Sequence, residues 1–266
     1  MTQRPSYFEP AGPGRYRPTG QAGGAWRDDE IHFSPLGGLI THAIDLHRAD
    51  RAEPDQPRDG KQLGRLSFDI LGQLGQDECE IQVETIRPGR TIELIQATAS
   101  IAGRAAVLAR AWFVAATDTT SVAGGAPEPL PAPEQAPGHP MTETWGGGYV
   151  RSLDVRAISS ARPGRTTAWL RTGTELVAGT SVSPQAAFIA LVDTANGIAV
   201  RQPPTAWMYP NLDLTIHLHR QPAGGWVGLD TSVTFGPSGL GLTSTTLHDV
   251  AGPVGRAEQI LTVRPL

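Results

Sequence analysis

The chain has very little cysteine. Among its 266 residues there is one, Cys79. A single cysteine cannot form an intramolecular disulfide, and it offers no Cys-x-x-Cys pair for zinc binding or thiol redox chemistry. This cysteine usage is typical of a protein in a reducing compartment, so we expect a cytoplasmic protein in which cysteine chemistry plays no part.

Long hydrophobic runs and blocks of positive charge are also missing. The longest wholly apolar run, Ala186 to Val192, has seven residues, whereas about 20 are needed to span a bilayer. The N-terminus lacks the apolar core of a signal peptide. The net charge is −4, and no basic cluster could neutralise a phosphate backbone. We therefore expect a soluble protein that binds neither membrane nor nucleic acid.

Glycine and proline are plentiful, with 31 and 23 residues, which favours short strands and tight turns over a helical bundle. Between about residues 117 and 143 the chain becomes rich in Ala, Gly, Pro and Thr, a composition that cannot bury a face. This stretch divides the chain into an N-terminal domain (1–116), a linker (117–143) and a C-terminal domain (144–266).

The two halves resemble each other under a constant shift of 149 residues. The shift places Ser34-Pro35 on Ser183-Pro184 and Thr85 on Thr234. Most matched residues are turn or cap residues, which a duplicated backbone must keep while other side chains diverge. In each half, serine as N-cap and proline as first helical residue would open an apolar helix. The pattern indicates an ancient duplication.

Each of these helices is followed by a series of strands. Apolar residues alternate with polar ones along 212–218 and 66–70, with the period of two that is typical of a half-buried strand. Further strands are expected at 79–86, 91–101, 104–115, 152–159, 165–171, 226–235, 240–248 and 256–264. One helix followed by antiparallel strands, twice over, predicts an α+β tandem (double) hotdog fold, in which two antiparallel sheets each wrap around a central helix.

The C-terminal half carries a specific resemblance. Asn211-Leu212-Asp213, His219-Arg220, Trp226, Thr234 and Glu258-Gln259 follow a pattern that resembles the acyl-CoA thioesterase II family, the double-hotdog thioesterases. In the first half, Gly37-Gly38 and residues 83–89 are similar to that family as well. The resemblance implies a hydrolase of fatty acid metabolism that cleaves an acyl-CoA thioester into a carboxylic acid and CoA, with no cofactor.

The resemblance also implies where the chemistry takes place. Asp213, Thr234 and Gln259 would hold the hydrolytic water, with Asp213 accepting or orienting its proton. Backbone N–H groups near Gly37, Gly38 and Leu39 would stabilise the carbonyl oxygen, because a helix start has unpaired N–H groups. His219 and Arg220 would contact a phosphate of CoA.

The repeat makes this hypothesis asymmetric. Under the 149-residue shift, the counterparts of Asp213, Thr234 and Gln259 are Gly64, Thr85 and Arg110, so the first half lacks the carboxylate and the amide. Conversely, the second helix begins with Gln185-Ala186 instead of a glycine pair. We expect one composite site per chain, with water-holding side chains from the second half and backbone donors from the first.

Other functions fit less well. His217 and His219 could share a metal, but no third ligand has matching spacing, and Gly236-Pro237-Ser238-Gly239 is not the Gly-x-Ser-x-Gly elbow of serine hydrolases. An enoyl-CoA hydratase would need an Asp/His motif that Asp45-Leu46-His47 does not match. A non-catalytic acyl-thioester-binding protein is the main alternative. Because the second half can cover the first, a monomer is already a minimal unit, and a homodimer is compatible with it.

Overall fold

The computed structural model describes residues 4–51, 60–158 and 162–266. Two longer helices, α1 (Phe33–Asp50) and α3 (Pro184–Val192), are accompanied by two single-turn helices, α2 (Gly148–Arg151) and α4 (Ala195–Ile198). The strands of the first half are β1 (Ser6–Gly12), β2 (Arg15–Pro18), β3 (Lys61–Ile70), β4 (Cys79–Arg87), β5 (Ile92–Ile101) and β6 (Arg104–Ala115). Those of the second half are β7 (Leu153–Ala157), β8 (Arg165–Thr172), β9 (Glu175–Val177), β10 (Trp207–Met208), β11 (Asp213–Leu218), β12 (Val227–Phe235), β13 (Leu240–Asp249), β14 (Gly252–Thr262) and β15 (Arg264–Pro265).

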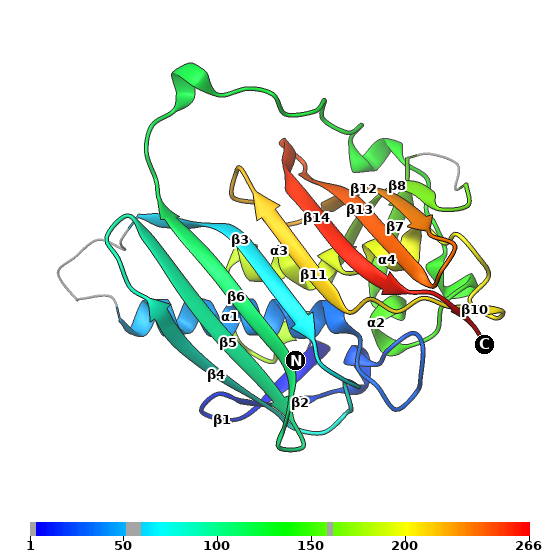
Figure 1. Ribbon diagram of the computed structural model, residues 1–266, viewed down its shortest axis with the longest axis horizontal. Coiled ribbons are helices and arrows are strands. Elements are labelled where there is room, and N and C mark those ends of the chain that lie inside the picture. The colour runs from blue at the N-terminus through cyan, green and yellow to red at the C-terminus, as the bar shows by residue number, and fades with distance from the viewer. Residues whose placement is uncertain (1–3, 52–59, 159–161) are drawn as a thin grey trace.

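The strands of both halves form one large sheet, where two separate sheets were expected. Its order is β7-β8-β12-β13-β14-β11-β3-β6-β5-β4-β2-β1-β9, and β10 pairs with β15 beside it. The halves are joined by β3 and β11, which pair antiparallel with Asp69 opposite Asp213 and Leu66 opposite Ile216. One pair is parallel, β1 with β9. Figure 1 shows β3 and β11 side by side at the junction.

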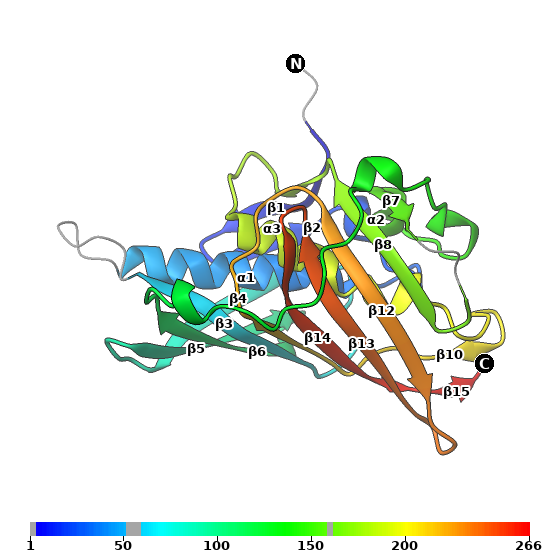
Figure 2. The same ribbon diagram turned by 90° about the horizontal axis from the view of Figure 1, so that it is seen from above.

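The two longer helices pack against each other on one side of this sheet (Figure 2). The second helix begins as expected, because the Ser183 hydroxyl accepts a hydrogen bond from the Ala186 N–H and Pro184 follows. The first begins earlier than expected. Its N-cap is His32, whose ring accepts a hydrogen bond from the Ser34 N–H, so Ser34 lies inside the helix. An imidazole nitrogen here takes the part of the usual hydroxyl or carboxylate oxygen.

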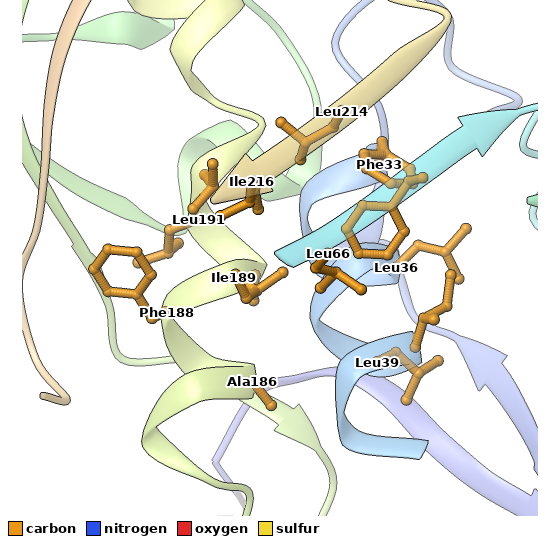
Figure 3. Packing of buried hydrophobic residues seen from close by; sticks show 14 of the residues in the cluster. Phe33, Leu36, Leu39, Leu66, Ala186, Phe188, Ile189, Leu191, Leu214 and Ile216 are labelled. Atoms are coloured by element: carbon orange, nitrogen blue, oxygen red, sulfur yellow. The ribbon is translucent and has the colours of Figure 1, made fainter. Parts of the chain in front are cut away.

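Apolar side chains from the helices and the joining strands meet in one core. Leu36 and Leu39 of α1, Ile189 of α3, Leu66 of β3 and Ile216 of β11 are all buried. Figure 3 shows them converging in the space between the helices and the sheet. Because this core draws on both halves, β3 and β11 are held at the centre of the sheet by burial as well as by their ladder of hydrogen bonds.

The Pro-rich stretch 117–143 contains three short 3-10 turns, Thr120–Val122, Pro133–Gln135 and Met141–Glu143, and neither an α-helix nor a strand. It is held against the second half, where the indole N–H of Trp169 on β8 donates to the Pro131 carbonyl oxygen at 2.8 Å. Further along, β7 is shorter than the strand expected at 152–159, and residue 159 lies outside the described residues.

Candidate active site

A buried carboxylate stands at the end of helix α3. The helix is almost wholly apolar and ends at Val192, and Asp193 is its C-cap. Asn211 and Gln259 each donate a side-chain hydrogen bond to Oδ1 of Asp193, at 2.8 and 2.7 Å. No described residue donates to the other oxygen, Oδ2. Two amides therefore fix the orientation of the carboxylate and leave one oxygen available.

The surroundings of Asp193 make it an unusual acid. Burial raises its pKa to about 7, against the opposing effect of the hydrogen bonds from Asn211 and Gln259. A charged carboxylate is poorly solvated in such a place, so the proton is held more tightly. A carboxyl group that titrates near neutral pH is well matched to proton transfer, because it is ionised often enough to accept a proton and basic enough to hold it.

Gln259 is placed by the register of the sheet. It lies opposite Thr243 in the β13–β14 ladder, and its side chain is buried. While its Nε2 donates to Asp193, its Oε1 is buried without a hydrogen-bond partner among the described residues. An unsatisfied buried oxygen is costly and uncommon in folded proteins. Gln259 is not among the described residues that line the cavity, so it acts there through Asp193, whose carboxylate it orients.

His32 approaches the same carboxylate from the first half. As N-cap of α1 it is held at Nδ1 by the Ser34 N–H, at 3.1 Å. Its ring stacks on Tyr149, with centroids 4.2 Å apart, and Nδ1 lies 3.7 Å from Oδ2 of Asp193. Burial lowers the pKa of His32 to about 3, so the imidazole is neutral at physiological pH.

These groups border a cavity of about 330 Å³ that both halves line. Its polar side includes His32, Asp193 and Asn211, and its apolar side includes Trp26, Trp145 and Leu74. Trp26 packs edge-on against Trp145 and Tyr209, with ring centroids 4.7 and 5.1 Å away. A mostly apolar hollow with a few convergent polar groups is the usual form of a small-molecule site.

The structure does not bring together the three residues expected to hold water. Gln259 points inward to Asp193. Asp213 instead accepts a hydrogen bond from the backbone N–H of Ile260, the residue that follows Gln259. Thr234 is exposed, one residue after the buried Val233. Because side chains alternate along a strand, Asp213 and Thr234 lie on the face of the sheet opposite the cavity. The expected trio is thus not a geometric unit.

The glycine pair also has a different setting from the one expected. Gly37, Gly38 and Leu39 follow the first turn of α1, where backbone N–H groups already bond within the helix,. All three are buried. A Cβ built on Gly38 would lie 2.5 Å from the Cβ of Ala190, so α1 and α3 approach each other closely at this glycine. The structure accounts for Gly38 by helix packing rather than by an exposed N–H.

Neither residue expected at a CoA phosphate is among the described residues that line the cavity. Arg220 makes a two-pronged ion pair with Asp249, with both distances 2.7 Å, and also donates to the carbonyl oxygens of Gly252 and Pro253. Its guanidinium is thereby committed to the turn between β13 and β14. His219 is exposed at the end of β11. The contact of this pair with a CoA phosphate stays a prediction.

Sequence reasoning missed Asp193, Asn211 and His32. A signal for Asp193 was available, since it is a lone carboxylate directly after the longest apolar run of the chain. Asn211 belonged to the family-like motif but was passed over for its neighbour Asp213. His32 gave no local signal, because histidine is not among the favoured N-caps.

Two further features bear on the kind of site. No helix in the described residues is long and apolar enough to cross a membrane. The same part of the chain also contains no group of three or more His, Cys, Asp or Glu side chains arranged to hold a metal ion.

Comparison with known proteins agrees with this architecture. A structure of acyl-CoA thioesterase II from Mycobacterium marinum superposes with a TM-score of 0.65 at 17% identity, covering 97% of this chain and 95% of that one. A hot dog fold protein of unknown function from Alicyclobacillus acidocaldarius gives 0.69 at 15% identity, with coverage of 97% and 95%. At these identities the likeness concerns the fold alone. No curated protein sequence matches the chain.

Family models carry the assignment further. The acyl-CoA thioesterase N-terminal domain matches residues 23–114, and the acyl-CoA thioesterase C-terminal domain matches residues 133–263. Together they span most of the sequence and place both halves of the cavity inside matched regions. The chain belongs to the acyl-CoA thioesterase family.

Proposed function

We propose that this protein hydrolyses acyl-CoA thioesters, with Asp193 as the general base. One observation carries the proposal: a buried carboxylate, fixed at one oxygen by Asn211 and Gln259, keeps its second oxygen available at a mostly apolar cavity. The apolar wall suits an acyl group, and the polar end suits a thioester carbonyl and a water molecule. Family membership points to the same reaction.

The reaction needs no covalent bond between the enzyme and the acyl group. A water molecule attacks the carbonyl carbon while Oδ2 of Asp193 takes one of its protons. Asn211 and Gln259 hold Oδ1 of Asp193, so that Oδ2 keeps its direction towards the attacking water,. The tetrahedral intermediate then collapses, the C–S bond breaks, and CoA leaves as a thiolate. Asp193 passes its proton to that sulfur and returns to its starting state.

We infer that the two halves form one catalytic unit with a single site. The first half (1–116) supplies His32 and part of the cavity wall, the second (144–266) supplies the carboxylate and amides, and 117–143 connects them. At the start of α3, the Ser183 hydroxyl donates to Asp45 inside α1 at 2.6 Å, a counterpart of the approach of His32, at the start of α1, to Asp193 after α3. Neither Ser183 nor Asp45 lines the cavity beside Asp193.

A panel of acyl-CoA substrates tests the function directly. Thiol release from acetyl- to palmitoyl-CoA, with branched and aromatic acyl groups included, should give kcat/KM of about 10⁴ M⁻¹s⁻¹ or more for the preferred substrate. Hydration of an enoyl-CoA, followed by loss of its double-bond absorbance, would indicate a hydratase instead. Calorimetric binding with neither reaction would indicate a receptor, and both of these results would reject the proposal.

The pH dependence of hydrolysis should report the ionisation of Asp193. Only its carboxylate form can accept a proton from water, and burial raises its pKa to about 7. We therefore expect kcat/KM to fall about tenfold per pH unit below pH 7 and to level off above it. A rate profile measured from pH 5 to 9 checks this. A plateau extending down to pH 5 would mean that an ordinary exposed carboxylate is the base.

The acyl preference should depend on Met141. Met141, Trp145 and Gly197 line both the main cavity and a second one of about 240 Å³. We expect Met141→Ala to connect the two and to raise kcat/KM for longer acyl chains relative to shorter ones by about tenfold, since each buried methylene contributes about 0.8 kcal/mol. The acyl-CoA panel measures the ratio.

Met208→Ala is the matched control for this change, because Met208 lies on β10 and lines neither cavity. It should leave the chain-length ratio as it is in the wild type. Met141→Ala itself should cost about 2–3 kcal/mol of stability, because the side chain is buried,. An unchanged ratio in a folded Met141→Ala variant would show that the acyl chain does not extend past this residue.

A further inference from the structure

We propose that His32 is a catalytic residue whose Nε2–H donates a hydrogen bond to the thioester carbonyl oxygen. The inference rests on the proposed function and adds to it the electrophilic partner of Asp193. The family resemblance implies that backbone N–H groups of Gly37, Gly38 and Leu39 have this role, but these residues lie beyond the first turn of α1. With those groups bonded inside the helix, the carbonyl oxygen needs another donor, and the imidazole is placed to provide one.

The tautomer of His32 follows from its cap. The backbone N–H of Ser34 can only donate, and it points to Nδ1 at 3.1 Å. Nδ1 is therefore the bare nitrogen, and the single proton of the neutral ring resides on Nε2. That N–H has no hydrogen-bond partner among the described residues, and it is not among their buried unsatisfied atoms. It is consequently accessible, on a ring that lines the cavity.

The position of the ring suits a donor opposite the base. Nδ1 is 3.7 Å from Oδ2 of Asp193, and Nε2 is the far nitrogen of the same small ring. A water within about 3 Å of the base attacks a carbon about 3 Å further on, and the carbonyl oxygen then needs a donor at about 2.7–3.1 Å. A thioester bound between the two residues places its carbonyl carbon next to the water on Asp193 and its carbonyl oxygen next to Nε2 of His32.

The chemistry also favours a neutral imidazole. Because the pKa of His32 is lowered to about 3 by burial, the ring neither forms an ion pair with Asp193 nor gives up its proton during the reaction. It polarises the carbonyl as a hydrogen-bond donor while the new C–O bond to water forms and the carbonyl oxygen gains charge. It keeps that proton when the C–S bond breaks. All proton transfer thus passes through Asp193, and the two residues have separate tasks.

The orientation of the His32 ring is fixed by the side chain that stacks on it. Tyr149 stacks on it, and the Tyr149 hydroxyl pairs with the Thr194 hydroxyl at 2.6 Å and donates to the Ala190 carbonyl oxygen at 3.2 Å. The side chain on which His32 rests is therefore tied to helix α3 and to the residue after Asp193. A donor that is already oriented loses no energy to reorganisation when charge develops.

The test is a pair of variants that keep the helix cap. Serine and asparagine are both good N-caps, but in His32→Ser no donor reaches the carbonyl. We expect kcat for His32→Ser to fall about 100- to 1,000-fold, with KM changed less than about threefold. His32→Asn retains an N–H on a shorter side chain and should lie between Ser and wild type. His217→Ser, at an exposed position on β11, is the control and should have wild-type kcat.

A spectroscopic readout separates a donor from a structural residue. In a ketone analogue of the substrate, with the thioester sulfur replaced by a methylene group, a hydrogen bond lowers the infrared stretching frequency of the carbonyl. Binding to wild type and to Asp193→Asn should lower it, and binding to His32→Ser should not. A wild-type kcat in His32→Ser, or a carbonyl shift that survives this substitution, would overturn the inference. Absence of thioester hydrolysis by the wild type would instead reject the proposed function.

Discussion

Asp193→Asn should reduce acyl-CoA hydrolysis by about 1,000-fold or more while leaving the folded protein as stable as the wild type, or more so. The rate effect follows from the loss of the base, because an amide cannot take a proton from water and general-base catalysis contributes about 10²–10⁴-fold. Asparagine has nearly the shape of aspartate, and its oxygen can still accept the hydrogen bonds from Asn211 and Gln259. The lost activity would thus not reflect a disrupted site.

The stability effect has a definite sign. The folded protein binds the Asp193 proton with a pKa of about 7, whereas an unfolded chain binds it near 3.9. Between these values the native state carries more protons than the unfolded state, so the contribution of this residue to stability falls as pH rises from about 4 to 7. Asp193→Asn removes the buried charge, and with it this loss of stability at neutral pH. Melting curves at pH 7.5 should place Asp193→Asn at or above wild type.

Asp213→Asn is the matched control, because Asp213 follows Asn211 by only two residues. Its side-chain oxygen would still accept the hydrogen bond that Asp213 receives from the Ile260 N–H. We expect its kcat to stay within about threefold of wild type, since Asp213 lies outside the cavity lining. The assignment of the base would be reversed by full activity in Asp193→Asn together with inactivity in Asp213→Asn. Thiol release under saturating acyl-CoA measures both.

The strands show how far periodicity alone can lead. The expected strand 104–115 matches β6, and those at 79–86 and 240–248 each differ from β4 and β13 by one residue. These segments alternate clearly, and alternation is a property of the local sequence. Strand partners are not local. Nothing in 66–70 and 212–218 identified β3 and β11 as neighbours, so two sheets were expected where pairing makes one. The short strands β1, β2 and β9 were missed altogether.

The structure separates the expected site residues at one turn of the chain. Leu212, Leu214 and Ile216 read as a single alternating row, but Leu214 and Ile216 are buried while Leu212 is exposed. The alternation of side chains between the two faces of the sheet is therefore interrupted just before β11 begins. Asn211 consequently points to Asp193, and Asp213 points away. Such a change depends on tertiary contacts, here the bond from the Leu212 N–H to the Ile260 carbonyl oxygen. The resemblance located the segment, and the structure shows which of its neighbouring side chains lines the cavity.

The glycine pair allows a second prediction with a large effect, in stability rather than catalysis. Gly38→Ala should lower the free energy of unfolding by about 3 kcal/mol, at the upper end for an overpacked core. Its Cβ would lie 2.5 Å from the Cβ of Ala190 and 2.9 Å from its Cα, both on helix α3. Alanine is otherwise favoured over glycine in a helix by about 1 kcal/mol, so a net loss would show that the helix contact dominates.

Gly37→Ala, one position earlier, isolates that contact. The nearest atoms to its added Cβ would belong to the rings of Phe33 and Phe68, at 3.5 and 3.7 Å, which is ordinary packing distance. We expect this variant to be as stable as wild type or slightly more stable. Chemical denaturation monitored by tryptophan fluorescence measures both single variants.

A compensating exchange completes the test. In Gly38→Ala/Ala190→Gly the methyl group moves from one helix to the other, which removes the methyl–methyl clash but keeps the close approach to the Cα of residue 190. About half of the lost stability should return, less than full recovery because glycine at 190 also weakens α3. If the double variant were as unstable as the sum of its parts, the helices would not be in contact here. Since α3 ends at Val192, directly before Asp193, and α1 begins directly after His32, the helix spacing set at Gly38 also keeps the proposed base and the proposed donor close to each other.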